Sequence, residues 1–161
     1  MANIKLELVK LCKEFGELNA VDDVSIAIEE SETMALLGPS GCGKTTILNM
    51  IVGLEKPTSG EILIDGKSVL NVPPGQRNVG LVFQDYAVFT HMTVRQNLAY
   101  GLKLRKMKQP EIDREIYKVS EFLSLGHQLD RKPSELGASE LQRVAIGRTL
   151  VTNPEILLLD E

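Results

Sequence analysis

The spacing of hydrophobic residues predicts strands in the first half of the chain and again at its end. Apolar and polar residues alternate in three segments, which predicts half-buried strands at residues 3–11, 24–28 and 61–64. Continuous apolar runs predict buried strands at residues 34–37, 79–83 and 156–159. Phe15-Gly16 marks a turn between the first two strands, and Asp65-Gly66 marks a hairpin after the third alternating segment.

Helical spacing separates these groups of strands. After the first buried run, a helix is predicted from the apolar positions Ile47, Leu48, Met50, Ile51 and Leu54. The pattern is helical from Thr93 onward, with one helix starting at Pro110 and expected to be capped by Gly126. The apolar face of that helix comprises Ile112, Ile116, Val119, Phe122 and Leu123. A further helix is predicted over 140–150, ended by Asn153-Pro154, and the whole order predicts an α/β fold.

Size and composition are those of one domain with a hydrophobic core, because the chain has 161 residues. The 18 Lys and Arg against 22 Asp and Glu give a net charge of −4, which argues against a nucleic-acid partner, as do the few aromatic residues. No apolar run is long enough to span a membrane, and the start, interrupted by Lys5, Glu7 and Lys10, does not resemble a signal peptide. Cys12 and Cys42 lack metal-ligand spacing, and a disulfide at Cys42 would distort the glycine-rich segment in which it lies, so free thiols in a reducing cytosol are expected.

A glycine-rich segment follows the first buried run and fits the phosphate-binding pattern G-x-x-x-x-G-K-[ST]. Its residues are Gly38, Pro39, Ser40, Gly41, Cys42, Gly43, Lys44, Thr45 and Thr46. Gly38, Gly41 and Gly43 can adopt positive φ angles, which turn backbone amides and the next helix N-terminus toward an anion. Lys44 can reach the β- and γ-phosphates, and Thr45 can ligate Mg²⁺. The segment therefore predicts binding of a nucleoside triphosphate.

Asp160 and Glu161 follow the last apolar strand and complete the predicted nucleotide site. Ligands of open α/β sheets bind at the carboxyl ends of strands, so both carboxylates are expected to face the phosphates. Asp160 is suited to hold Mg²⁺, and Glu161 is suited to act as the general base on water. The chain has no Asn-Lys-x-Asp motif for reading guanine, which favours ATP over GTP.

Four stretches taken together are those of a known family: residues 38–46, 82–87, 143–148 and 157–161. On them, the chain resembles the nucleotide-binding subunits of ATP-binding cassette (ABC) transporters from end to end. Three shorter stretches resemble the branch that powers sugar import, the maltose and glycerol-phosphate type: residues 73–77, 91–94 and 130–133. The resemblance implies a P-loop NTPase fold with a RecA-like core, an antiparallel β subdomain and an α-helical insert, and ATP and Mg²⁺ as ligands.

The resemblance also implies roles for single residues. Phe15 corresponds to the aromatic residue that stacks on adenine, and Val21 to an apolar contact beside it. Gln84 corresponds to a residue that contacts Mg²⁺ and the attacking water, so Gln84 and Glu161 are the expected catalytic residues. The expected Mg²⁺ ligands are Thr45, Gln84 and Asp160.

Partners and domain organisation follow from the same resemblance. Residues 86–92 would dock on the coupling helix of a membrane permease, with Phe89 and Met92 as exposed apolar contacts, and a second ABC subunit would complete a head-to-tail dimer. The expected location is the cytoplasm, at the inner face of the cell membrane, without a nucleic-acid partner. The chain is expected to form a single ABC-type domain, 1–161. Within it, residues 1–91 are expected to form the β subdomain and the phosphate-loop part of the core, residues 92–150 the helical subdomain and residues 151–161 the last strand.

The family's signature, Leu-Ser-Gly-Gly-Gln, is altered in this chain. Residues 136–140 read Leu-Gly-Ala-Ser-Glu, whereas in the family this segment binds the γ-phosphate held by the opposite subunit. Gly137 lacks the hydroxyl, a loss of about 1.5–3 kcal/mol for a hydrogen bond to a charged group. Glu140 adds about 2 kcal/mol of repulsion per phosphate charge at a separation of about 8 Å and an effective dielectric of about 20. Ser139 and Gln142 instead predict a capping box at an ordinary helix start.

Two functional hypotheses follow from these observations. In the first, the chain hydrolyses ATP and energises an ABC importer of sugars or related solutes. In the second, it is a truncated or degenerate domain that binds Mg-ATP and hydrolyses it poorly, because the family continues past Glu161 with an interface loop, an inner strand and a switch histidine. Without that strand, the core is expected to be incomplete and to have unpaired edges. A nucleic-acid-linked ABC protein is a weaker third alternative, since the chain has no coiled-coil insertion.

Overall fold

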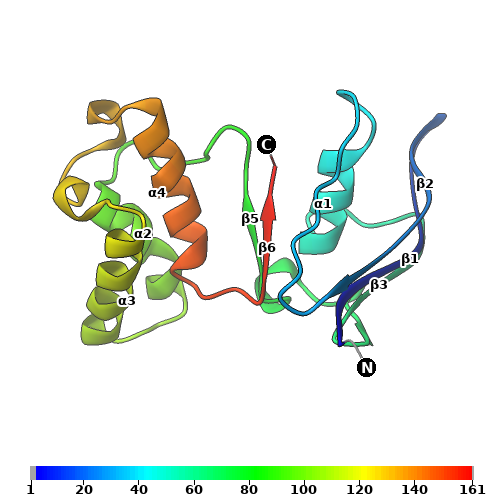
Figure 1. The fold of residues 1–161 in the computed structure, drawn as a ribbon, viewed down its shortest axis with the longest axis horizontal. Helices are drawn as coiled ribbons and strands as arrows, with labels where there is room; N and C mark the ends of the chain where they lie inside the picture. Colours follow the sequence, from blue (N-terminus) through cyan, green and yellow to red (C-terminus); the bar gives the residue numbers. More distant parts are fainter. Residues whose placement is uncertain (1–2, 161) are drawn as a thin grey trace. The chain divides into compact units, whose positions relative to one another are not determined.

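Two compact units make up the chain. The computed structural model describes residues 3–160 (Figure 1), and its contacts divide the chain into Met1–Val79 and Gly80–Glu161. The first unit holds an antiparallel sheet and one α-helix, and the second holds three α-helices and a pair of strands, counted over the described residues. The predicted α/β class is confirmed.

The sheet of the first unit is antiparallel and has the strand order β2-β1-β3-β4. Its strands are β1 (Ile4–Phe15), β2 (Leu18–Glu29), β3 (Ser59–Ile64) and β4 (Lys67–Ser68). A two-residue turn joins β1 to β2, with Phe15 opposite Leu18, and the turn at Asp65-Gly66 joins β3 to β4. The predicted strands and turns are thus confirmed, and β1 and β2 are longer than their alternation indicated.

Helix α1 (Lys44–Val52) supplies the other part of the core of the first unit. The buried residues of the helix are Ile47, Leu48, Met50, Ile51 and Val52, and those of the sheet include Leu6, Leu8, Leu11 and Ile62. Gly53, at φ 91°, ends the helix, and its amide donates to the carbonyl of Asn49 (3.0 Å). Leu54 was predicted on the apolar face, but it is exposed because the left-handed Gly53 turns the chain off the helix before it.

The apolar run at 34–37 is not a strand, so the prediction of a buried strand there is wrong. Met34 is 41% exposed and Leu37 is 92% exposed, and no strand described in the structure pairs with this run. A strand requires a neighbouring backbone that satisfies its N–H and C=O groups. Hydrophobic side chains alone do not supply such a neighbour.

The second unit is built on α2 (Val94–Leu104), α3 (Gln109–Phe122) and α4 (Ala138–Leu150). Nine buried residues from the helices and their connections form its core: Val94, Leu98, Ala99, Leu102, Ile112, Ile116, Leu125, Val144 and Val151. Thr93 begins α2 with a capping box, in which the Thr93 and Gln96 side chains accept from each other's backbone amides. No helix among residues 3–160 is both long enough and apolar enough to cross a bilayer.

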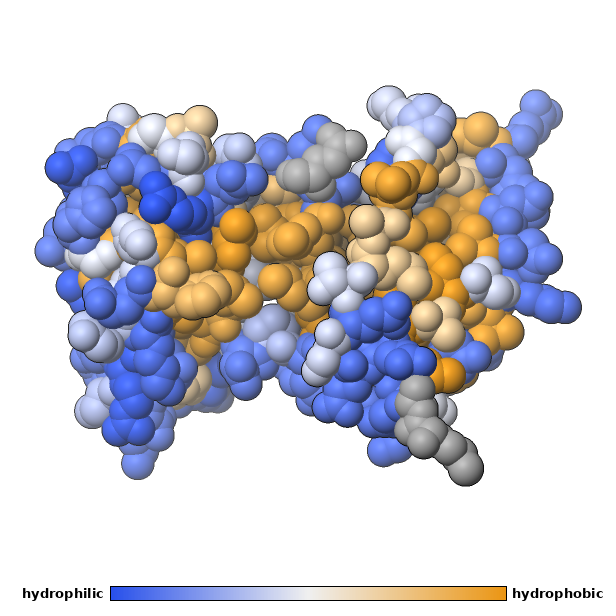
Figure 2. Space-filling model, in the orientation of Figure 1, coloured by the Kyte–Doolittle hydropathy of each residue, from blue (hydrophilic) through white to orange (hydrophobic). Residues whose placement is uncertain are grey.

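Strands β5 (Val79–Val82), which lies in the second unit from Gly80 onward, and β6 (Ile156–Leu159) pair with each other, and both strands were predicted from their apolar runs. Directly after β6, the amide of Asp160 donates to the carbonyl of Val82 (3.0 Å), so the carboxyl ends of the two strands lie side by side. The prediction that 156–159 is a buried strand is wrong as to burial, because Leu157 and Leu159 of β6 are exposed. Figure 2 shows hydrophobic surface over this strand pair.

Two details of α3 differ from the prediction. Phe122, expected on the buried face, is 78% exposed, because it lies about 240° around the helix from Ile116. Gly126 does not cap the helix, which ends at Phe122 with Leu123 as its cap. Instead, Gly126 begins a short 3₁₀ segment, Gly126–Gln128. Two other 3₁₀ segments of the same length are Pro74–Gln76 and Pro133–Glu135.

Candidate nucleotide-binding site

The glycine-rich segment 38–46 forms a loop that leads directly into α1. Gly41 and Gly43 have φ angles of 81° and 96°, which confirms the left-handed geometry predicted for them. Gly43 is the N-cap of α1 and gives the helix no side-chain cap. The first amides of the helix therefore meet no acceptor from the side chain of their N-cap, which is an arrangement suited to a phosphate group.

A Cβ added at either of two loop glycines would meet a close neighbour. A Cβ at Gly43 would lie 2.4 Å from the carbonyl oxygen of Ala20 and 3.3 Å from Cγ2 of Val21, so this end of the loop lies against β2. A Cβ at Gly38 would lie 2.6 Å from Sγ of Cys42. The φ angle of Gly38 is not positive, which corrects the prediction, and the atom that its Cβ would meet is the end of the exposed Cys42 side chain.

Lys44 folds back across the loop. Its Nζ donates to the carbonyls of Gly38 (2.8 Å) and Pro39 (3.0 Å) and lies 3.8 Å from Sγ of Cys42. The ammonium group is therefore centred on the loop, where phosphate oxygens could replace the two carbonyls. Six loop residues are exposed around it: Gly38, Pro39, Ser40, Gly41, Cys42 and Thr45. Thr46 is partly buried.

Phe15 and Val21 lie in the same unit as the loop but in different surroundings. Phe15 is the last residue of β1 and is 48% exposed, so its ring is open to a ligand. Val21, on β2, is buried and packs beside Gly43. The structure thus brings Val21 against the phosphate loop and leaves Phe15 as an exposed aromatic surface at the strand end.

Gln84 and Asp160 lie at the carboxyl ends of the two paired strands in the second unit. Asp160 is held beside Val82 by its backbone amide, and Gln84 follows Val82 by two residues. Carboxylate and amide oxygens are ligands that Mg²⁺ accepts. Glu161 lies outside the described residues. Within residues 3–160, no three His, Cys, Asp or Glu side chains gather as a metal-binding cluster.

Asn97 fixes the segment 86–92, which was predicted to dock on a membrane partner. The Asn97 side chain is buried and accepts from the amide of Phe89 (2.9 Å). Its Nδ2 donates to the carbonyls of Phe89 (3.0 Å), Met92 (3.2 Å) and Thr93 (3.0 Å). Phe89 and Met92 are partly buried, which corrects the expectation that both are exposed.

Arg148 of α4 packs under the same segment. Its Cζ lies 4.1 Å from the centroid of the Phe89 ring, and its guanidinium donates to the carbonyl of Ala87. Burial lowers the pKa of Arg148, and the electrostatic interaction with Tyr100 opposes that shift. Beside these residues is a pocket of about 150 Å³, whose lining includes Phe83, Tyr86, Tyr100 and Arg148. The second unit therefore offers a preformed concave surface next to Gln84.

Helix α4 begins in the altered signature segment and is capped by Glu140. The helix starts at Ala138 with Gly137 as its N-cap, and Oε2 of Glu140 accepts from the amide of Gly137 (2.8 Å). Oε1 of Glu140 accepts from Nε2 of Gln128 (2.6 Å). The expectation of an ordinary capped helix is correct, but the predicted N-cap at Ser139 is wrong because Ser139 lies inside the first turn.

Arg77 is a residue that sequence reasoning missed. Its side chain is only 8% exposed, and it donates to the carbonyls of Val72, Met50 and Ile51, each at 2.9 Å. Burial lowers the pKa of Arg77. The contacts tie the last turn of α1 to the segment before β5. No periodic signal marks an arginine in a proline-rich loop as buried.

Comparison with protein families and curated proteins gives consistent matches. A family model described as ABC transporter matches residues 21–161. Over 161 residues, the chain is 49% identical to the maltose/maltodextrin import ATP-binding protein MalK of Yersinia pestis, covering all of this chain and 43% of that protein. It is 48% identical over 167 residues to the trehalose/maltose import ATP-binding protein MalK of Thermococcus litoralis, covering 44% of it. The chain spans less than half the length of these relatives.

Solved structures agree with these matches. A nucleotide-free ATP-binding cassette from an ABC transporter is 30% identical with a TM-score of 0.85, covering 98% of this chain and 69% of that one. A dimeric ATP-binding cassette in a post-hydrolysis state, bound to ADP and Pi, is 31% identical with a TM-score of 0.86, covering 97% and 73%. The chain therefore belongs to the ABC transporter family and has the P-loop NTPase fold of its ATP-binding cassettes.

Proposed function

We propose that the chain is the ATP-binding part of a subunit that energises an ABC importer for sugars or related solutes. The observation that carries the proposal is the loop at 38–46, with two left-handed glycines, an uncapped helix start and Lys44 centred on it. The names of the relatives, maltose and trehalose importers, support sugars as the substrate class.

The loop residues provide the donors that a triphosphate needs. The backbone amides around Gly41 and Gly43 would bind phosphate oxygens, and Lys44 would exchange its two carbonyl partners for them. Phe15 would stack on the adenine, with Val21 beside it. Thr45, Gln84 and Asp160 would hold Mg²⁺, which would supply positive charge to offset that of the phosphates. Gln84 would orient the attacking water and Glu161 would accept its proton.

The partners belong to the same proposal. The pocket beside Phe83 and Tyr100, with the segment 86–92 held over Arg148, supports docking of an apolar helix end from a membrane permease. A second ABC subunit would close head-to-tail over the nucleotide, and the protein would lie in the cytoplasm at the membrane surface. In this proposal, residues 1–91 comprise the β subdomain and phosphate-loop part of the core, 92–150 the helical subdomain and 151–161 the last strand.

A second candidate function is binding of Mg-ATP with poor hydrolysis. The carboxylate of Glu140 occupies the start of α4, since it accepts hydrogen bonds from Gly137 and Gln128. In a dimer, that helix start would have to receive the γ-phosphate of the opposite subunit. An anion already placed there opposes the approach of another one.

The experiment that tests the first candidate is ATP turnover by the chain assembled with its membrane partner, compared with Glu161→Gln. The expected result is turnover at least tenfold above that variant, because the variant lacks the general base, a loss of roughly 10²–10⁴-fold. Equal rates, combined with retained ATP binding, would support the second candidate and contradict the first.

A further inference from the structure

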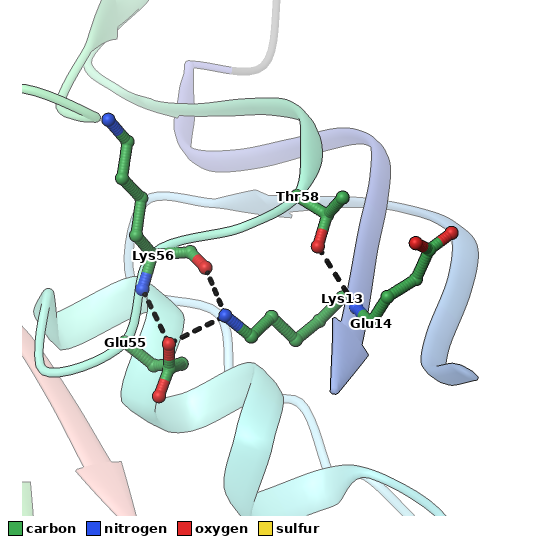
Figure 3. A network of polar contacts seen from close by, with 5 residues as sticks. All are labelled: Lys13, Glu14, Glu55, Lys56 and Thr58. Carbon is green, nitrogen blue, oxygen red and sulfur yellow. Dashed lines mark hydrogen bonds and ion pairs between the residues drawn. The ribbon is translucent and has the colours of Figure 1, made fainter. Parts of the chain in front are cut away.

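Lys13, two residues before Phe15 near the end of β1, makes three contacts, two of which are drawn in Figure 3. Its Nζ donates to Oε1 of Glu55 (2.6 Å) and to the backbone carbonyl of Lys56 (2.8 Å). The same ammonium group lies 4.7 Å from the centroid of the Phe15 ring. The Lys13 side chain is only 13% exposed, so the charge is held in place by these groups.

The ammonium group of Lys13 lies on one of the two faces of the Phe15 ring. A cation within about 6 Å of a ring centroid is attracted to the face of the ring. One face of Phe15 is therefore taken by Lys13, although 48% of the residue stays exposed. The exposed part is the surface that remains for a second flat group.

Glu55 and Lys56 connect Lys13 to the helix that begins at the phosphate loop. Both residues follow α1 by a few positions, and α1 starts at Lys44. The amides of Leu54 and Glu55 both donate to the carbonyl of Asn49, so this segment is fastened to the helix end. An α-helix of nine residues is a rigid element about 13 Å long. Lys13 thus links the strand end that carries Phe15 to one end of the helix whose other end carries the loop.

The contact with Glu55 is favoured by both charges. The hydrogen bond from Lys13, and then the one from the amide of Lys56, lower the pKa of the Glu55 carboxyl group. The pair is therefore an ion pair at neutral pH. Neighbouring Glu14 contacts this segment only through its backbone amide in Figure 3, which donates to Oγ1 of Thr58 (3.0 Å).

We propose that Lys13, held by Glu55, is a positioning residue that fixes the Phe15 ring for stacking on the base of a bound nucleotide. This inference rests on the proposed function, because it requires a nucleotide whose phosphates occupy the loop. The proposal attributes the affinity for the base to Lys13 and Phe15, which lie outside the phosphate-binding motif. A cation on one ring face also draws electron density from the ring, which favours an electron-rich purine on the other face.

The test separates the two ends of the ligand. Binding of Mg-ATP and of Mg-tripolyphosphate, which has no base, is measured by calorimetry on the whole chain. Lys13→Met keeps the length of the side chain and removes its charge. The expected result is an ATP dissociation constant raised about three- to tenfold, the size of a weakened cation–π contact and base stack. The tripolyphosphate constant is expected to stay within about twofold.

Three further variants show whether Lys13 acts through Phe15. In a Phe15→Ala background, Lys13→Met is expected to cause no further loss of ATP affinity. Lys13→Arg keeps a cation at the ring and is expected to retain the wild-type ATP constant within about twofold. Thr58→Val is the matched control, since it removes a neighbouring hydrogen bond of β1 and leaves Lys13 intact. It is expected to change neither constant.

Each remaining outcome contradicts the inference. If Lys13→Met weakens both ligands equally, or still weakens ATP binding without Phe15, the residue has only a structural role. If Lys13→Met does not fold, Glu55→Gln replaces it, and equal ATP affinity in that variant overturns the proposal. If the wild-type chain binds neither ligand, the proposed function fails first and the inference fails with it. If the wild type binds ATP and the variants match it, the inference alone fails.

Discussion

The guanidinium group of Arg77 fills the space beside Gly53 that a side chain would need. A Cβ added at Gly53 would lie 2.6 Å from Cζ and 2.7 Å from Nε of Arg77. Three carbonyls hold that guanidinium group in place, two of them in the last turn of α1. The buried guanidinium group of Arg77 therefore requires a residue without a Cβ at position 53, where the phosphate-loop helix ends.

Gly53→Ala is expected to lower the free energy of unfolding by about 2 kcal/mol, mostly the cost of a left-handed φ for a residue with a Cβ. Arg77→Met is expected to cost about 2–4 kcal/mol, because it leaves buried carbonyls without donors. Urea unfolding of both variants and of the double variant measures these losses. The double variant should lose less than the sum, since the clash disappears with the guanidinium group. Strict additivity would contradict the proposed contact.

Asn97→Ala is expected to release the segment 86–92 without unfolding α2. The amide of Phe89 donates to the Asn97 side chain, so its protection depends on that group. Hydrogen exchange at Phe89 should become at least tenfold faster in the variant, because a buried hydrogen bond is worth about 1–3 kcal/mol. Exchange at amides inside α2 serves as the control and should change little. Unchanged exchange at Phe89 would show that Asn97 does not hold the segment.

Restoring Leu-Ser-Gly-Gly-Gln at 136–140 is expected to raise ATP turnover in the assembled transporter. The change removes the Glu140 carboxylate that now caps α4, and it adds a hydroxyl at position 137. The two effects together are about 4 kcal/mol, or on the order of a thousandfold at most. Steady-state turnover of the restored and original chains measures the difference. Equal turnover would contradict the role given to Glu140.

The Lys13–Glu55 pair is expected to lose its effect in acid. The pKa of Glu55 is lowered from its ordinary value of 4.5 by the hydrogen bond from Lys13. A carboxyl group whose pKa is lower in the folded chain than in the unfolded chain stabilises the fold at any pH above its unfolded-state pKa. This contribution disappears as the pH falls through the folded-state pKa. The stability difference between wild type and Glu55→Gln should therefore be constant above pH 4.5 and shrink below it. A stability difference that grows as the pH falls would contradict the stabilising role given to the Lys13–Glu55 pair.

The sequence was most informative where one short segment determines its own geometry. The turns at Gly16 and Asp65-Gly66 and the left-handed Gly41 and Gly43 all depend on residues within a few positions of one another. Each was predicted correctly because turn chemistry is local. The phosphate loop was predicted from the sequence for the same reason, because its residues lie within one short segment.

Features that depend on distant partners were missed. The run at 34–37 has the composition of a strand, but no described strand pairs with it. Arg77 is buried by carbonyls about 26 residues away in sequence, and Lys13 reaches Glu55 across 42 residues. Ser139 lost its predicted capping role to Glu140, because the helix starts earlier and Gln128 holds that carboxylate. Periodicity in one sequence contains none of these contacts.

The central claim is that the loop at 38–46 binds the phosphates of ATP, and calorimetry of Mg-ATP with wild type and Lys44→Met tests it most directly. We expect saturable binding of one nucleotide per chain in the wild type. In the variant, we expect affinity at least tenfold lower, because the loss of a charged contact to phosphate costs about 1.5–3 kcal/mol. The variant should keep its melting temperature within a few degrees, since the two Lys44 partners are loop carbonyls. Equal affinity in a folded variant, or no binding by the wild type, would contradict the claim.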